Sequence, residues 1–139
     1  AREIECSVLG NEDPKASLPG EIIPSNEFYD YKAKYLDGGK SKLLIPAPLA
    51  GEQIKKIQEL SVKAFKALDC SGMARVDFLI DKISGIIYIN ELNTIPGFTK
   101  ISMYPKMWEA SGISYKQLID ELIQLAQKRH QQKQSLRLT

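Results

Sequence analysis

Two carboxylates, one amide and one guanidinium occur at alternating positions in two predicted strands of the 139-residue chain. Arg75 and Asp77 are two residues apart in the first strand, and Glu91 and Asn93 are two apart in the second. Because successive side chains in a strand point to opposite faces, the members of each pair share a face. Oxygen ligands without His or Cys are typical of Mg²⁺ or Mn²⁺ sites in which phosphates complete the coordination shell.

The two strands are expected at Met73–Asp81 and Ile86–Asn93, with a Lys-Ile-Ser-Gly turn between them. A three-residue loop at 83–85 places Gly85 at the left-handed position that such loops favour. A loop of different length would divide the cluster between the two faces of the sheet, because side chains alternate with a period of two.

The three-residue loop fixes how the polar residues pair. It places Asp77 opposite Glu91, and Arg75 opposite Asn93. With strict alternation, the face of the second strand that carries these residues also carries Ile87 and Ile89. Cross-strand ion pairs on a solvated sheet face are the alternative to a metal site, and spacing alone leaves both open.

Hydrophobic periodicity predicts the elements around this strand pair. Ile4, Cys6 and Val8 alternate with polar residues and indicate a half-buried strand at the very start of the chain, as in the C-terminal part of a longer protein. The other expected elements are a loop at 11–20, a strand at 43–45, a helix at 51–68 stopped by Gly72, a short helix at 104–110, and a last helix from Ser114. Ser114 and Gln117 match a capping box, and the helix is expected to fray from Arg129.

The composition is that of an ordinary folded domain. Hydrophobic residues make up 43% and charged residues 26% of the chain, which permits a core without disulfides or a structural metal. The net charge of +2 is too small to indicate a nucleic-acid or membrane binder. No apolar stretch is long enough for a membrane span. Cys6 and Cys70 lack CxxC spacing and are expected to be reduced thiols of a cytoplasmic protein.

A second candidate site is the aromatic and basic stretch around Lys34. Its tyrosines and lysines are interrupted by acidic residues, so a polynucleotide would meet charges of alternating sign. A loop that folds over a small phosphorylated ligand fits this pattern better, and a solvated loop with buried aromatic rings is the alternative. His130 has no nucleophile motif near it and is expected to take no part in catalysis.

Three motifs resemble the C-terminal ATP-grasp part of the D-alanine–D-alanine ligase family: EFYDYKAKY at 27–35, GMARVDFLID at 72–81 and INELNTIPGFTKISMYP at 89–105. The resemblance covers nearly the whole chain and implies an α+β fold, an antiparallel sheet with flanking helices that closes over ATP from one side. It implies that residues 1–128 are the C-terminal part of the ligase domain, without its N-terminal and central parts, and that 129–139 are a polar tail.

The resemblance also assigns ligands for the nucleotide. Asp77, Glu91 and Asn93 match the residues that bind two Mg²⁺ (or Mn²⁺) ions between the phosphates of ATP. Glu3 matches the acid that holds the ribose hydroxyls. Lys34 matches a lysine that reaches the phosphates from a mobile loop, and the segment 34–41 is expected to act as a lid.

The groups around the reacting carbon are implied in the same way. Arg75 and the backbone N–H of Gly97 match the donors to a tetrahedral oxyanion. Ser102 matches a serine that holds the carboxylate of the second D-alanine, although Ile101 stands where many relatives have His or another residue. Tyr35 matches the loop tyrosine of ligases that use D-alanine as acceptor, and the loop lacks the His of enzymes that make a D-lactate ester.

The implied protein is a cytoplasmic enzyme of peptidoglycan synthesis, a homodimer at full length, with no nucleic-acid or membrane partner. It would join two D-alanines at the expense of ATP through an acylphosphate. Two alternatives remain: a related ligase with D-lactate or D-serine as acceptor, and a non-catalytic nucleotide-binding domain. The joint presence of Asp77, Glu91, Arg75 and Lys34 argues against the non-catalytic domain.

Overall fold

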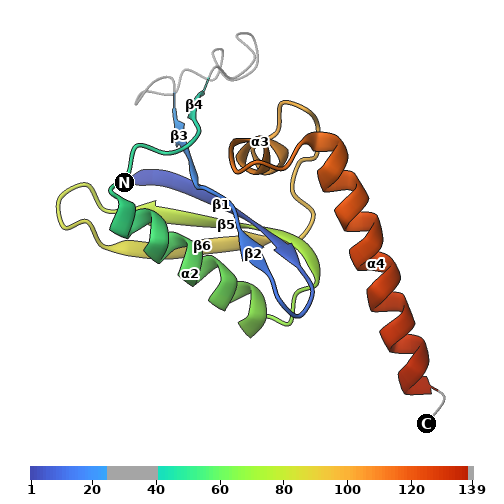
Figure 1. Ribbon diagram of the computed structural model, residues 1–139. Coiled ribbons are helices and arrows are strands. Elements are labelled where there is room, and N and C mark those ends of the chain that lie inside the picture. Colours follow the sequence, from blue (N-terminus) through green and yellow to red (C-terminus); the bar gives the residue numbers. More distant parts are fainter. Residues whose placement is uncertain (25–40, 138–139) are drawn as a thin grey trace, which may run out of the picture.

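The computed structural model describes residues 1–24 and 41–137, and Figure 1 shows them as an antiparallel sheet flanked by helices. The strands are β1 (Arg2–Gly10), β2 (Lys15–Ala16), β3 (Gly20–Ile23), β4 (Lys42–Leu44), β5 (Gly72–Ile80) and β6 (Ile87–Asn93). The helices are α2 (Gly51–Ala67), α3 (Met103–Ala110) and α4 (Tyr115–Arg137). The strand order is β4-β3-β1-β5-β6, with β2 paired to the end of β1. The predicted α+β fold class is confirmed.

Helices cover both faces of the sheet, and its central strand β1 contributes residues to the core on each side. Alternate residues of β1 and β5 pack with α2 in a core that contains Ile4, Cys6, Val8, Ala74, Val76, Phe78, Ile80, Ile57 and Phe65. On the opposite face, Leu9 packs with Tyr104, Trp108 and Leu118 of α3 and α4. In Figure 1, α2 lies along one side of the sheet, away from α3 and α4. The polar residues that alternate with the α2-side core therefore share a face with α3.

The hairpin between β5 and β6 differs from the predicted one. Gly85 has the expected left-handed conformation, with φ of 70°. Next to the loop, however, Ile80 pairs with Ile87, one residue out of step with a three-residue loop. The shift is reversed further along, where Asn90 forms a β-bulge between the pairs of Phe78 and Asp77.

The bulge corrects the predicted faces of β6. Ile87 and Ile89 pair with core residues of β5 and lie on the α2 side of the sheet. Glu91 and Asn93 follow the bulge and lie on the other side. The expectation that all four share one face was wrong, because an extra residue in a strand reverses the alternation beyond it.

The remaining differences concern element ends. Asp69, with φ of 52°, takes the left-handed turn after α2, whereas Gly72 already begins β5. The expected loop at 11–20 contains the two residues of β2. Helix α4 continues to Arg137 instead of fraying at Arg129, because its polar end is rich in Gln, Lys and Arg, which are good helix formers. The capping box before α4 is confirmed by bonds between Ser114 and Gln117 in both directions.

No helix in the parts of the chain that the structure describes is long and apolar enough to cross a membrane.

Candidate active site

Three carboxylates lie side by side on neighbouring strands, on the face of the sheet away from α2. Glu5 on β1 pairs with Asp77 on β5, and Asp77 pairs with Glu91 on β6. Directly paired residues of antiparallel strands project from the same face, with Cβ atoms about 5 Å apart. We call Glu5, Asp77 and Glu91 the carboxylate row. The predicted pairing of Asp77 with Glu91, and of Arg75 with Asn93, is confirmed.

Arg75 binds Asp77 through two parallel hydrogen bonds. Its Nε donates to Oδ1 at 2.7 Å, and its Nη2 donates to Oδ2 at 2.7 Å. Two charge-assisted bonds in this fork geometry fix both side chains. The hydrogen bonding of Arg75 to Asp77 is also the main cause that raises the pKa of Arg75, so the guanidinium stays charged. Three N–H donors of the guanidinium remain for other acceptors.

Glu5 is the most deeply buried member of the carboxylate row, with 7% of its surface exposed. Its Oε2 lies 3.3 Å from Arg75 Nε, but that N–H is directed at Asp77, and Oε2 has no hydrogen-bond partner among the described residues. The pKa of Glu5 is raised to about 7, mainly by burial; Arg75 lowers this pKa, and the nearby acids Asp77, Glu3 and Glu91 raise it.

Sequence reasoning missed Glu5. The period-two pattern of β1 placed this residue on a polar face, and that was right. The burial of that face was not visible, because it depends on β1 having strands on both sides and α3 above its far end. The one signal for Glu5 in the sequence was its acidic side chain, two positions after Glu3 and on the same predicted face.

A cavity of about 270 Å³ lies at the carboxylate row. Its lining includes Glu3, Glu5, Asp77, Asn90 and Glu91. Glu3 is exposed on the same face as Glu5, so the structure brings this predicted ribose ligand beside the predicted metal ligands. Four acids line the cavity, and Arg75 alone among the described cations forms ion pairs with them. The local charge therefore favours a divalent cation.

The donor set fits such a cation when a ligand supplies further oxygens. Asp77, Glu91 and Asn93 offer carboxylate and amide oxygens, which Mg²⁺ prefers. Across residues 1–24 and 41–137, no group of three or more His, Cys, Asp or Glu is arranged to hold a metal ion unaided. The side-chain oxygen of Asn93 also accepts the N–H of Ile95 at 2.9 Å. Sites of this kind bind Mg²⁺ through one or two carboxylates together with substrate phosphates.

The segment after β6 carries the other predicted substrate-binding groups. Ser102 Oγ accepts the N–H of Thr99 at 3.0 Å and lies 2.8 Å from its hydroxyl. A Cβ on Gly97 would come within 3.2 Å of Ser102 Oγ, so the absence of a side chain lets the backbone approach this serine. The structure therefore brings Gly97 and Ser102 together. Ile101 is 76% exposed.

Helix α4 anchors this segment. The hydroxyl of Tyr115 donates to the carbonyl of Phe98 at 2.9 Å, and the two rings pack with centroids 5.6 Å apart. Tyr115, in the first turn of α4, was not identified from the sequence, where it stands only as a residue of the capped helix start. Two predicted site residues, Lys34 and Tyr35, lie outside the described residues.

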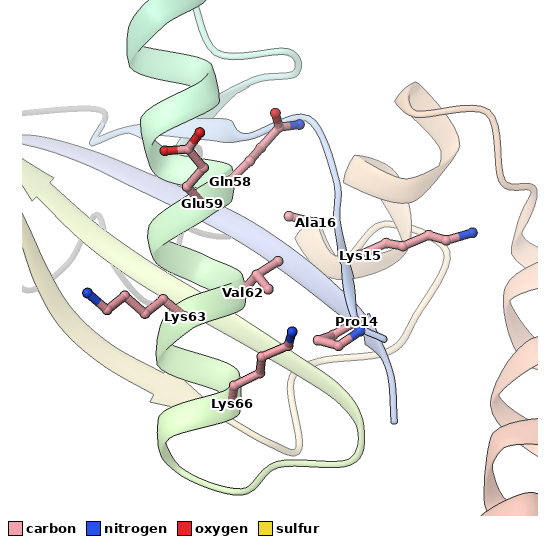
Figure 2. Close-up of a pocket in the computed structure, with 8 residues that line it drawn as sticks. All are labelled: Pro14, Lys15, Ala16, Gln58, Glu59, Val62, Lys63 and Lys66. Atoms are coloured by element: carbon pink, nitrogen blue, oxygen red, sulfur yellow. The ribbon is translucent and has the colours of Figure 1, made fainter. Parts of the chain in front are cut away.

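Larger grooves lie elsewhere on the surface. Figure 2 shows one of about 580 Å³ between β2 and α2, lined by Pro14, Lys15, Ala16, Gln58, Glu59, Val62, Lys63 and Lys66. Three of its side chains are lysines, and Glu59 is its one acid. The groove lacks paired carboxylates and shares no lining residue with the cavity at the carboxylate row. Size therefore does not identify the site; the chemistry of the carboxylate row does.

The chain is similar to known proteins over almost its full length. Residues 1–124 match the family model described as "D-ala D-ala ligase C-terminus". A D-alanine–D-alanine ligase of Thermoanaerobacter sp. is 68% identical over 133 residues, which are 96% of this chain and 37% of that relative. The chain thus spans little more than a third of the length of this curated relative.

Solved structures agree with this match. The D-alanine–D-alanine ligase from Coxiella burnetii superposes with a TM-score of 0.83 at 50% identity, over 97% of this chain and 34% of that one. A D-alanine–D-alanine ligase from Bacillus anthracis, solved in complex with ATP, has a TM-score of 0.75 at 34% identity, over 96% of this chain and 42% of that one.

Proposed function

Because the chain belongs to the D-alanine–D-alanine ligase family, we propose that it is the C-terminal, metal- and phosphate-binding part of an enzyme that joins two D-alanines at the expense of ATP. The chain covers 37% of the Thermoanaerobacter relative, which supports the proposal that it is part of a longer protein. We call that longer protein the complete ligase; its other segments would complete the active site. Such an enzyme would act in the cytoplasm, in peptidoglycan synthesis, and as a homodimer.

The observation that carries this proposal is the pairing of Asp77 with Glu91 while Arg75 is held beside them. Phosphoryl transfer requires mainly positioning and neutralisation of charge. Two carboxylates that line one cavity attract a divalent cation, and the guanidinium supplies a fixed positive charge next to it. A non-catalytic nucleotide-binding domain would not need a half-buried guanidinium beside these carboxylates.

The first step would transfer the γ-phosphoryl group of ATP to the carboxylate of one D-alanine, giving an acylphosphate and ADP. Bound Mg²⁺ (or Mn²⁺) would neutralise the phosphate charge and hold the phosphates in position. Asp77, Glu91 and Asn93 would hold two such ions, and Glu3 would accept hydrogen bonds from the ribose hydroxyls. Lys34 would contact the phosphates.

The second step would be attack of the amine of another D-alanine on the acylphosphate carbon, followed by loss of phosphate. The remaining donors of Arg75 and the N–H of Gly97 would stabilise the negative oxygen, and one such donor contributes roughly 3 kcal/mol. Ser102, which is already fixed by Thr99, would hold the carboxylate of the attacking D-alanine. Tyr35 would lie beside the acceptor.

The test is an acceptor comparison on the complete ligase. Phosphate release and product mass are measured with ATP, Mg²⁺ and D-alanine, first alone and then with D-serine or D-lactate in competition. The proposal expects D-alanyl-D-alanine as the main product. A main product that contains D-serine or D-lactate would show that this compound, and not D-alanine, is the preferred acceptor. No ligation with any of the three would refute the proposed function.

A further inference from the structure

Glu5 has an environment that a purely structural residue does not need. It lies on the central strand, and its side chain, 9% exposed, is directed to the same face as Asp77 and Glu91. One of its oxygens, Oε2, accepts no hydrogen bond from any described residue. A buried carboxylate oxygen without a donor destabilises the fold, and an apolar residue of similar size would avoid that cost. A role at the site itself would explain why this position carries an acid.

The guanidinium of Arg75 lies between two carboxylates and is bonded to only one of them. Nε donates to Asp77 at 2.7 Å, while Glu5 Oε2 lies 3.3 Å from the same atom. Each oxygen of Asp77 accepts one hydrogen bond from Arg75. A cation that binds Asp77 must compete with a positive group already in place, and Arg75 then needs another anion.

We propose that Glu5 is a positioning residue, the second ion-pair partner of Arg75, which receives the guanidinium when Asp77 binds a divalent cation. This inference rests on the proposed function, because it requires a metal ion at Asp77. A small rotation of the guanidinium transfers the Nε hydrogen bond from Asp77 to Glu5. The oxygen without a donor then gains one, and Asp77 gains a free lone pair for the ion.

This exchange of partners lets the side chain of Arg75 serve two purposes. Without a cation, the fork from Arg75 offsets the repulsion between Asp77 and its acidic neighbours. With a cation, Glu5 keeps the guanidinium beside the reacting centre, so that the charge of Arg75 is neither expelled nor left in contact with the metal. Without Glu5, Arg75 stays on Asp77 and lowers its affinity for the ion.

The test measures Mn²⁺ binding to the complete ligase by electron paramagnetic resonance of the free ion, in the presence of ATP. Glu5→Gln keeps the shape of the side chain and removes its charge. The apparent Kd for Mn²⁺ should rise roughly tenfold or more, as is usual when a residue that orients a metal ligand is changed. Glu5→Asp, which keeps the charge, should recover part of that loss. Glu59→Gln, the same change at an exposed site on α2, should leave the Kd unchanged.

A double-mutant cycle with Arg75→Gln separates positioning from direct ligation. If Glu5 acts through Arg75, Glu5→Gln should have little further effect on Mn²⁺ binding once Arg75 is replaced. An undiminished effect would overturn the proposal and make Glu5 a metal ligand. An unchanged Kd in the single variant, with near-ultraviolet circular dichroism like the wild type, would also overturn it. Failure of the wild-type ligase to make any dipeptide would instead refute the proposed function.

Discussion

Asp77 and Glu91 lie directly opposite each other although the hairpin that joins their strands is one residue out of step with that pairing. In a ladder continued from the loop without interruption, Asn90 would oppose Asp77, and Glu91 would turn toward α2. The bulge at Asn90 absorbs one residue and returns Glu91 to the face that carries Asp77. Bulges commonly direct a side chain beside an active site, and this one completes the carboxylate row.

This relationship predicts opposite effects of two changes at the bulge. Deletion of Asn90 leaves Asp77 and Glu91 paired in a regular ladder, so the complete ligase should still bind Mn²⁺ within a few-fold of the wild type. Insertion of one alanine after Asn90 should abolish binding, because Glu91 then opposes Val76 if the bulge stays, or Arg75 if the strand becomes regular, and in neither case Asp77. Mn²⁺ titration compares the two. Equal binding by both variants would show that the bulge does not set the face of Glu91.

Removal of the hydroxyl of Tyr115 should weaken acceptor binding more than it weakens the fold. Tyr115→Phe keeps the ring against Phe98 and loses the hydrogen bond to its carbonyl, which contributes about 1 kcal/mol. We expect the KM for the second D-alanine to rise several-fold while the KM for ATP stays the same. Tyr88→Phe, at a side chain that is 53% exposed on β6, is the matched control. A higher KM for ATP alone would contradict this role.

The burial of Glu5 predicts how stability depends on pH. Its pKa is about 7 in the folded chain and near 4.5 when exposed. Between those values the folded chain keeps a proton that the unfolded chain has lost, so the free energy of unfolding contributed by this group falls as pH rises from about 4.5 to about 7. Urea unfolding of the 139-residue chain, in a metal-free buffer, should show this decline. Glu5→Gln lacks this titrating group and should not show this part of the decline. An identical decline in the variant would contradict the assignment to Glu5.

Much of this site follows from local sequence patterns, and the rest depends on pairing over long distances. The start of α4 was predictable because Ser114 and Gln117 bond each other across one helical turn. The pairing of Asp77 with Glu91 was predicted correctly, but from a loop that the structure does not have. The bulge at Asn90 leaves no mark in composition or period, since any residue can be the extra one. The burial of Glu5 follows from the strands and the helix around it, which no local window contains.

The 139-residue chain by itself should bind Mg-ATP weakly and form no dipeptide. In the proposed function its cavity would hold the nucleotide from one side only, and an incompletely enclosed ligand does not offset the entropy lost on binding. Calorimetry should give a Kd above about 1 mM, and a phosphate assay with D-alanine should show no turnover. Micromolar binding together with ligation would mean that these 139 residues contain the complete active site.

The central claim is that Asp77 and Glu91 bind the metal ions of an ATP-dependent ligase, and Glu91→Gln in the complete ligase tests it most directly. Glu91 is exposed on β6, so the substitution should leave circular dichroism unchanged. D-alanine-dependent phosphate release at saturating Mg²⁺ should fall by at least about a hundredfold, typical of the loss of one charge-stabilising group. Glu59→Gln should retain full activity. A rate near that of the wild type for folded Glu91→Gln would contradict the account.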